Sequence, residues 1–424
     1  MTRRFVNLVT ASYRSRMYSL HRLDVSKYLF YPSTAEAEAA AAANADAENN
    51  DRSRSDGGNP PRIDKLRRLP EPSVRLQPYL QYGGMWSPGD MFSLLSPRGG
   101  GSGEAGRILH TSEDGHAILC DMDSCSTKTM PSLNLPKGWD PISFAVPGGN
   151  CAGAGEERLY VMRSDGPFNL EVLHLGHGSP EYKLHPVPHH FNRWHREFKW
   201  QPLPPIAENR YFRIMSSTLL GDGRIICVSA LMYSKDDAAL GTYCFDTETH
   251  EWWQAGDWLL PFDGRAVHVP ELDTWLGFSP KKPCHLCAVD LTAVVMAPHQ
   301  APKVTHVLED LNPPPMESML IAPTRRFPTG RHATKEWQLM GYHLVNLGSG
   351  RFCVAKIFQV DKRVYQRCYS LHNHDSDEDT KLEDEFAVLT GVEVVRDGER
   401  GGLRMVKHKS KRYKFTSDCI KWVL

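Results

Sequence analysis

Three times along this chain, an apolar strand-like run meets a glycine-rich tight turn and then a second apolar run. This pattern predicts an antiparallel β-hairpin, because Gly and Asp accept the turn conformation that the flanking strands require. Hairpins repeated along a chain favour many short strands joined by turns. The three copies are residues 107–120 around Asp114-Gly115, residues 219–228 around Gly221-Asp222-Gly223, and residues 344–355 around Gly348-Ser349-Gly350.

A second element recurs near these hairpins, in which an apolar strand ends in Asp and a turn with a hydroxyl side chain follows. The Asp carboxylate at the first turn position accepts hydrogen bonds from backbone amides two and three residues further on. Asp246 begins the clearest copy, because the aromatic Trp252 returns on the next strand. Asp121 and Asp290 begin weaker copies.

The spacing of these Asp residues predicts a repeat architecture. Asp246 and Asp290 lie about 44 positions apart, and Asp121 precedes Asp246 by about three such steps. A period of about 40–50 residues with four short strands per unit is typical of propeller blades. We therefore predict an all-β, kelch-like β-propeller of five to six blades, closed by the N- and C-terminal strands.

The domain plan follows from this architecture. Residues 1–33 predict an N-terminal hairpin, including a strand over Tyr28–Leu29–Phe30–Tyr31 that stops at Pro32. Residues 73–424 form the propeller, and the hairpin is expected to pair with strands at Phe386–Leu389 and Leu403–Val406, which removes exposed sheet edges. Residues 34–72 have almost no aromatic or β-branched side chains. We expect a disordered insertion there, leaving room for a transient helix in its Ala/Glu part.

Charge and cysteine usage narrow the classes of function. Basic and acidic residues number 50 each, which argues against a general binder of nucleic acid or anionic membranes. No run of about 18 apolar residues predicts a membrane helix. The ten Cys are scattered and no secretory signal opens the chain, so we expect reduced thiols in the cytoplasm or nucleus. The arginine-rich N-terminus also fits a mitochondrial transit peptide, although we favour a hairpin of the fold.

Several segments resemble a known family. They are Gly241–Thr247 with Trp252, Val269–Gly277, Leu344–Cys353 and Phe386–Val395. They resemble a plant family greatly expanded in grasses, a DUF1618-type domain of unknown function related to kelch and F-box-associated repeats. The resemblance runs from Arg3 to Ser410 and skips the insertion. It implies a kelch-like propeller and no established activity. The stretch before the insertion is too short for the helices of an F-box.

Two groups of residues could hold a metal. Cys284 and Cys287 form a lone C-x-x-C, whereas a structural zinc site needs a second ligand pair; a structural role is favoured over zinc or redox chemistry. A histidine-rich stretch could bind zinc or copper, but it lacks the His-Glu-x-x-His spacing of a helical site, so we favour a surface loop. Its histidines are His185, His189, His190 and His195.

Asp375, Asp377 and Asp379 imitate the start of a calcium-binding loop. The loop would need Gly at its sixth position and Glu at its twelfth. The chain has Thr380 and Phe386 there, which leaves an acidic, solvated loop.

The basic run Lys407–Lys414 is a candidate for nucleic-acid binding or a nuclear address. A solvated sheet edge whose lysines block aggregation explains the same residues, and the zero net charge favours that interpretation. No G-x-x-x-x-G-K phosphate loop and no G-x-S-x-G nucleophile elbow is found.

From these patterns we expect a non-enzymatic protein-interaction scaffold with a protein partner and no cofactor. The alternative is a propeller enzyme or a carbohydrate-binding protein with its site at the mouth of the channel. Propeller function lies on loops that a single sequence does not rank. The sequence therefore assigns no catalytic, cofactor-binding or metal-binding residue and leaves the oligomeric state open.

Overall fold

The computed structural model of the chain is nearly all β. Its described part contains the helices α1 (Val25–Tyr28), α2 (Thr34–Arg52) and α3 (Thr292–Met296), and every other long element is a strand. The structure describes residues 3–12, 14–52, 63–77, 90–95, 106–138, 140–147, 157–175, 200–206, 211–232, 239–296, 300–309, 317–321, 331–365, 379–397, 402–415 and 417–424.

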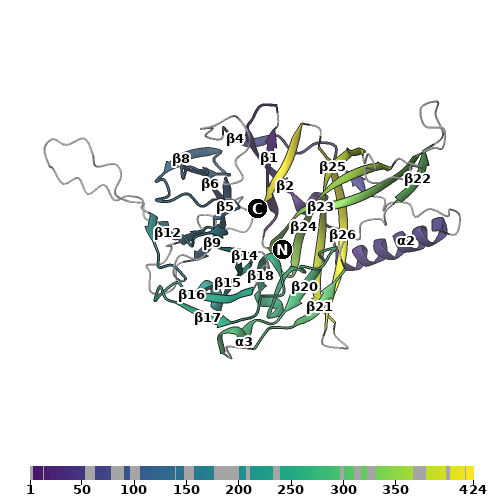
Figure 1. Ribbon diagram of the computed structural model, residues 1–424. Helices are drawn as coiled ribbons and strands as arrows, with labels where there is room; N and C mark the ends of the chain where they lie inside the picture. The colour runs from purple at the N-terminus through teal and green to yellow at the C-terminus, as the bar shows by residue number, and fades with distance from the viewer. Residues whose placement is uncertain are drawn as a thin grey trace, which may run out of the picture.

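Strand order divides the β structure into units 1 to 6, each built on four neighbouring antiparallel strands (Figure 1). Unit 1 contains β27 (Asp418–Val423), β1 (Phe5–Ser12), β2 (Tyr18–Asp24) and β4 (Pro72–Leu76), in that spatial order. Unit 2 contains β5 (Met91–Leu95), β6 (Arg107–Thr111), β7 (Ala117–Asp121) and β8 (Ser126–Met130). Unit 3 contains β9 (Ile142–Pro147), β10 (Glu157–Met162), β12 (Leu170–Leu175) and β13 (Trp200–Pro202).

In units 4 to 6, as in unit 2, strands that follow one another in the chain lie side by side. Unit 4 contains β14 (Phe212–Leu220), β15 (Ile225–Met232), β16 (Ala239–Asp246) and β17 (Trp252–Gly256). Unit 5 contains β18 (Asp263–Val269), β19 (Thr274–Phe278), β20 (Leu286–Val289) and β21 (Val304–Leu308). Unit 6 contains β23 (Arg331–Gly348), β24 (Arg351–Tyr365), β25 (Asp379–Arg396) and β26 (Leu403–Lys414), with β22 (Glu317–Ile321) and β3 (Asp64–Lys65) at its edges. The two-residue strand β11 (Asp165–Gly166) pairs with β14, and a short parallel pairing between β14 and β18 joins units 4 and 5.

Hydrophobic clusters lie between successive units. Val9 and Tyr18 of unit 1 share one cluster with Phe92 and Ile108 of unit 2. The same holds for Leu119 and Leu159 (units 2 and 3), Tyr160 and Ile226 (units 3 and 4), Cys227 and Cys287 (units 4 and 5), Leu276 and Phe352 (units 5 and 6), and Leu389 and Val6 (units 6 and 1). The last cluster returns to unit 1, so the packing runs through all the units and back to the first. Figure 1 shows the units in chain order around the middle of the view.

All three predicted hairpins are present, as β6–β7, β14–β15 and β23–β24. Their turns use residues with positive φ, among them Gly115 (87°), Asp222 (53°) and Ser349 (56°). Gly and Asp accept this conformation at low cost, which is why the turns could be read from the sequence.

The N-terminal hairpin is also present, but its expected partners were wrong. β1 pairs with β2 and, on its other side, with β27. The expected partners lie in β25 and β26, which pair with each other instead. The C-terminal strand β27 pairs with the edge of β1 that the sequence analysis expected β25 and β26 to cover.

The strand expected over Tyr28–Tyr31 is likewise not present. Asp24 caps a helical turn, because its carboxylate accepts a hydrogen bond from the Lys27 amide at 3.3 Å. The cap starts α1, and the chain then runs without regular structure to Pro32. Local capping therefore outweighed the β propensity of the aromatic residues.

The Ala/Glu part of the low-complexity segment, for which the sequence left room for a helix, is helical where the structure describes it. Helix α2 occupies Thr34–Arg52. Ser33 caps it through a hydrogen bond from the Glu36 amide at 3.2 Å, and Ala37 is fully buried. Ser-x-x-Glu is a capping box, and Ala and Glu are strong helix formers. Beyond the segment 53–62, which lies outside the described residues, β3 pairs in parallel with β26.

Candidate functional site

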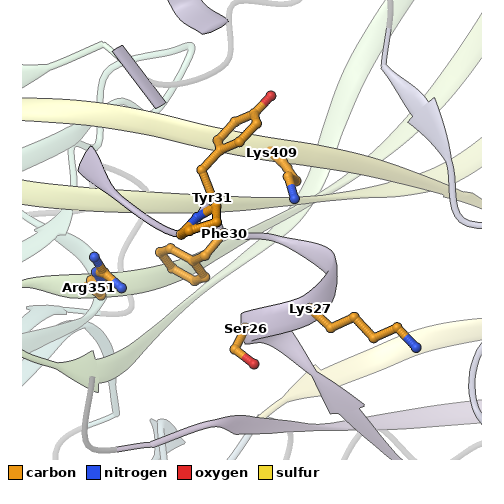
Figure 2. A pocket seen from close by; sticks show the side chains of 7 residues that line it. Ser26, Lys27, Phe30, Tyr31, Arg351 and Lys409 are labelled. Atoms are coloured by element: carbon orange, nitrogen blue, oxygen red, sulfur yellow. The ribbon is translucent and has the colours of Figure 1, made fainter. Parts of the chain in front are cut away.

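A surface pocket lies between α1 and the strands β24 and β26 (Figure 2). Its volume is about 370 Å³, and we call it the α1 pocket. The lining contains three cations, two aromatic rings and no carboxylate. The lining residues are Ser26, Lys27, Phe30, Tyr31, Pro32, Arg351 and Lys409.

The α1 wall of the pocket is held by Asp24. Its carboxylate accepts hydrogen bonds from the Ser26 hydroxyl at 2.6 Å and from the Arg4 guanidinium at 2.6 Å. Burial raises the pKa of Asp24, but the bonds from Arg4, Ser26 and the Lys27 amide outweigh it and keep the pKa below its usual value. The ionised cap fixes the helical turn that carries Ser26 and Lys27.

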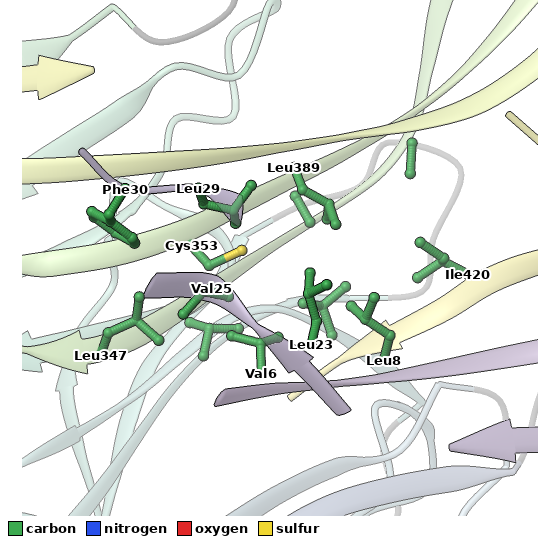
Figure 3. Close-up of a cluster of buried hydrophobic side chains, with 14 residues drawn as sticks. Val6, Leu8, Leu23, Val25, Leu29, Phe30, Leu347, Cys353, Leu389 and Ile420 are labelled. Atoms are coloured by element: carbon green, nitrogen blue, oxygen red, sulfur yellow. The ribbon is translucent and has the colours of Figure 1, made fainter. Parts of the chain in front are cut away.

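The floor of the pocket rests on the hydrophobic cluster between units 6 and 1. Figure 3 shows Leu29 and Phe30 packed with Val25, Cys353 and Leu389. Beside this cluster, the chain at Leu29 passes very close to β25. A Cβ at Gly391 would lie 2.3 Å from the Leu29 carbonyl oxygen, so only Gly fits there.

Arg351 forms the second wall. Its Nε donates to Oε1 of Glu393 at 3.3 Å, and its guanidinium carbon lies 5.6 Å from the centre of the Phe30 ring. A guanidinium over an aromatic face is a cation–π contact. Figure 2 shows Arg351 beside Phe30.

Glu393 is the anchor behind Arg351. The Thr34 hydroxyl donates to its Oε2 at 2.8 Å, and Nε2 of His408 lies 3.2 Å from the same oxygen. Burial raises the pKa of Glu393, yet these donors and Arg351 outweigh it and lower the pKa. Burial also lowers the pKa of His408. Its Nδ1 accepts the Tyr31 amide at 3.2 Å, so a neutral ring donates from Nε2 to Glu393.

Lys27 and Lys409 complete the cationic lining. The Lys409 ammonium lies 4.7 Å from the Tyr31 ring centre, and the Lys27 ammonium lies 5.4 Å from the Tyr28 ring centre. Among the described residues, neither ammonium has a carboxylate partner within ion-pair distance. Their charges are therefore available to an anionic ligand.

A second polar group joins the first strands of units 2, 3 and 5. The Ser93 hydroxyl donates to the Ser143 hydroxyl at 2.7 Å, and Arg265 donates to the Ser143 carbonyl oxygen at 3.1 Å. Arg265 is exposed to solvent. Protein nevertheless surrounds its guanidinium closely enough to lower its pKa by burial.

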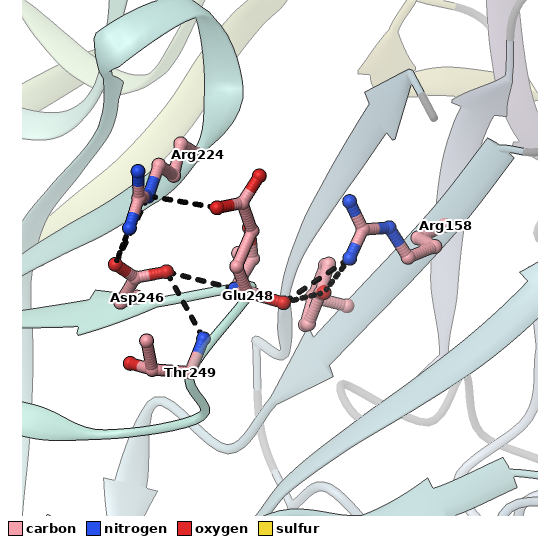
Figure 4. Close-up of polar contacts among 7 residues, drawn as sticks. Arg158, Arg224, Asp246, Glu248 and Thr249 are labelled. Carbon is pink, nitrogen blue, oxygen red and sulfur yellow. Dashed lines mark hydrogen bonds and ion pairs between the residues drawn. The ribbon is translucent and has the colours of Figure 1, made fainter. Parts of the chain in front are cut away.

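The Asp-started turns behave as the sequence predicted. Asp246 accepts from the amides of Glu248 at 2.8 Å and Thr249 at 3.3 Å, and Arg224 pairs with its other oxygen at 2.7 Å (Figure 4). Asp121 accepts from the amides two and three residues on, at 3.1 and 2.9 Å. In each case the Asp is the last residue of the third strand of its unit. In the turn that begins at Asp246, the carbonyl oxygen of Thr247 also accepts a hydrogen bond from Arg158 of unit 3 at 3.1 Å.

The sequence candidates for metals and nucleic acid take other roles or lie outside the described residues. Cys284 and Cys287 are buried and do not form a disulfide with each other, and burial raises the pKa of Cys287 to about 12. In the described part of the chain, no three His, Cys, Asp or Glu side chains gather as a metal site would require. The other candidates are outside that part: His185, His189, His190, His195, Asp375 and Asp377. Asp379 begins β25.

The basic run Lys407–Lys414 lies in the second part of the strand β26, and acidic side chains pair with much of its charge. Arg412 and Lys414 pair with Asp384 at 2.7 and 3.0 Å, and Lys411 pairs with Asp64 at 2.7 Å. Lys409 differs, because it lines the α1 pocket. Sequence reasoning missed this pocket, since its residues come from three distant segments and form no motif.

A family model described as "Protein of unknown function (DUF1668)" matches residues 3–413. The chain belongs to the DUF1668 family. The DUF1618-type label suggested by the sequence segments is not the one found, and a plant origin stays a prediction. A search of curated proteins finds no match to this DUF1668 chain.

Two solved structures have a weak similarity to this DUF1668 protein. One is the β-propeller domain of Myceliophteria thermophila Cps50 (Swd1), with 9% identity, 70% of this chain and 78% of that chain covered, and a TM-score of 0.32. The other is a lipopolysaccharide binding protein, with 8% identity, coverages of 77% and 78%, and a TM-score of 0.16. At such scores we draw nothing from either. No helix in the described part of the chain has the length and apolar character needed to cross a bilayer.

Proposed function

We propose that units 1 to 6 are the blades of a kelch-like β-propeller and that this propeller is a protein-interaction scaffold. The succession of hydrophobic clusters supports the architecture, because the cluster between units 6 and 1 links the last blade to the first. Residues 1–33 complete the first blade, 73–424 build the rest, and 34–72 are an insertion between them. Free thiols in the described residues support a reducing compartment, the cytoplasm or nucleus.

The docking site of this scaffold is the α1 pocket, and the partner is an acidic protein segment. One observation carries this assignment: the lining holds Lys27, Arg351 and Lys409 with no carboxylate among them, in a chain whose formal net charge is zero. Charge complementarity of this kind steers association and selects partners. The rings of Phe30 and Tyr31 add apolar surface beside the cations.

A peptide-binding experiment tests the docking function. A library of acidic peptides and its Lys-substituted counterpart are compared by fluorescence anisotropy with the full chain. We expect acidic peptides alone to bind, with affinity falling as salt rises. The double variant Lys27→Glu/Lys409→Glu should weaken binding at least about tenfold, equal to about 1.4 kcal/mol.

The single variants Lys27→Glu and Lys409→Glu are also measured, and Lys128→Glu is their matched control, since it makes the same change from +1 to −1 on β8 of unit 2. Melting temperatures check that each variant folds. Equal binding of basic and acidic peptides, or equal loss in the Lys128 variant, would contradict the assignment.

The second candidate function is an enzyme or carbohydrate-binding site at the mouth of the channel. Arg265, Ser143 and Ser93 support it, because they bring a guanidinium and hydroxyl groups from the first strands of three units together. A glycan and metabolite array should then give a signal that Arg265→Gln abolishes. An array without any such signal would leave the docking function as the better account.

A further inference from the structure

We propose that the α1 pocket recognises a phosphoryl group on the partner protein in preference to a carboxylate. This inference rests on the proposed docking function and names the chemical group that the pocket reads. It is carried by the number of cations, the geometry of Arg351 and the network behind Glu393.

The first argument is charge. A carboxylate carries one negative charge, whereas a phosphate monoester carries about −1.5 to −2 at neutral pH and offers three strong acceptor oxygens. The pocket has three cationic side chains from α1, β24 and β26. One carboxylate would leave most of this charge uncompensated, whereas a phosphoryl group carries close to two negative charges and compensates more of it.

The second argument is the geometry of Arg351. A guanidinium has five N–H donors in a rigid fork, and Arg351 makes its ion pair with Glu393 through Nε. Its side chain is 22% exposed, so it can contact a ligand without leaving Glu393. Arg is the side chain that best matches phosphate oxygens with two parallel hydrogen bonds.

The third argument concerns the charge of Glu393. A carboxylate bound only to Arg351 would neutralise the guanidinium and weaken the attraction for an anion. Glu393 instead meets Arg351 through Oε1 and Nε, and its Oε2 is occupied by the Thr34 hydroxyl and the His408 ring, so the carboxylate does not pair with the guanidinium through both oxygens. Glu393 is therefore a positioning residue, which orients the guanidinium against the Phe30 ring while other donors satisfy its second oxygen.

The shape of the pocket favours a phosphorylated side chain of a protein over a lipid headgroup. The volume of about 370 Å³ lies at the small end of the range of ligand-binding clefts. Phe30, Tyr31 and Pro32 offer apolar contact to the residues that flank the phosphate. Anionic membranes attract proteins through clusters of unpaired basic residues, whereas acidic partners meet Lys411, Arg412 and Lys414 on neighbouring β26.

The test uses three versions of each peptide, with phosphoserine, Glu or Ser at one position of the acidic library. We expect phosphoserine peptides to bind the full chain at least about tenfold more tightly than Glu peptides, and inorganic phosphate to compete. Arg351→Lys should reduce this preference several-fold while changing the affinity for Glu peptides less. Glu393→Gln should also reduce the preference, because the guanidinium loses its charged anchor. It should raise the affinity for both anionic peptides, because it removes a negative charge from beside the pocket.

Arg404→Lys is the matched control, since Arg404 lies on β26, pairs with Glu38 of α2 and does not line the pocket. Lys409→Gln is the second variant should Arg351→Lys fail to fold, and it should weaken phosphoserine binding. Equal affinity for phosphoserine and Glu peptides overturns the phosphoryl preference but leaves the docking function standing. Absence of binding to every acidic peptide overturns both. Binding to vesicles that contain phosphoinositides, without binding to phosphopeptides, would assign the phosphoryl group to lipid and overturn the protein source.

Discussion

Asn7 and Leu424 exchange two backbone hydrogen bonds, at 2.8 and 2.9 Å. Asn7 lies in the N-terminal strand β1, and Leu424 directly follows β27. This pairing makes unit 1 from both ends of the chain, and the cluster containing Val6, Leu8 and Ile420 fills the space between unit 1 and unit 6.

The first prediction concerns the packing of β27. Ile420→Ala should lower the free energy of unfolding by about 2–5 kcal/mol, because Ile420 is 2% exposed and the change leaves a cavity. Lys421→Ala, the neighbouring exposed position on the same strand, should change it by less than about 0.5 kcal/mol. Urea unfolding followed by tryptophan fluorescence measures both. Similar effects of the two changes would mean that β27 does not pack as described.

The second prediction concerns the Asp-started turn of unit 4. Asp246→Ala removes the acceptor of two backbone amides and of Arg224. It should cost about 1–3 kcal/mol of stability, because two turn amides and the guanidinium lose a charged acceptor. Glu248→Ala should cost less than about 1 kcal/mol, since its contact with Arg224 joins two half-exposed side chains at 3.4 Å. Thermal melting compares them, and a larger loss in the Glu248 variant would refute this account of the turn.

The third prediction concerns pH. Burial lowers the pKa of His343 to about 4, below the value of about 6.5 expected in the unfolded chain. Between pH 6.5 and 4 the unfolded chain therefore binds a proton that the folded chain does not, and stability falls as the pH falls. His343→Gln should reduce this slope by up to about 1.4 kcal/mol per pH unit.

Urea titrations at several pH values between 7.5 and 4.5 measure that slope. His21 and His408 also have lowered pKa values through burial, so a residual slope is expected in the His343 variant. An unchanged slope would show that His343 does not titrate in this way.

The fourth prediction joins the fold to the pocket. Gly391→Ala places a methyl group 2.3 Å from the Leu29 carbonyl oxygen, which must move the segment that carries Phe30 and Tyr31. We expect a lower melting temperature and weaker binding of acidic peptides. Gly341→Ala on β23 is the control, because its Cβ would meet Ile357 at 3.7 Å, an ordinary contact. Normal peptide binding by the Gly391 variant would contradict the positioning role of Leu29.

The sequence predicted the features that depend on local chemistry. The hairpin turn at Gly115 and the carboxylate-capped turns at Asp121 and Asp246 follow from residues next to one another in the chain, because backbone conformation and short-range hydrogen bonds decide them. The partner of β1 was misassigned, since strand patterns show which face is buried but not which distant strand lies alongside.

The α1 pocket was beyond prediction for a related reason. Arg351 and Lys409 come to Lys27 through the pairing of β24, β25 and β26 and through the close pass of Leu29 over Gly391. No spacing in the sequence predicts that Lys27, Arg351 and Lys409 line the same pocket. The capping box at Ser33 and Glu36 is visible in the sequence. The low complexity of the residues after it nevertheless favoured a prediction of disorder over a prediction of a helix.

The position of β27 also affects the order of events during synthesis. β1 is synthesised long before β27, so the edge of β1 that pairs with β27 has no partner until β27 emerges. Units 2 to 5 consist of strands that follow one another and can form as they appear. Unit 1, and with it the seam against unit 6, can be completed only after β27 has been made, so the edge of β1 is open to other strands for longer than the edges within units 2 to 5.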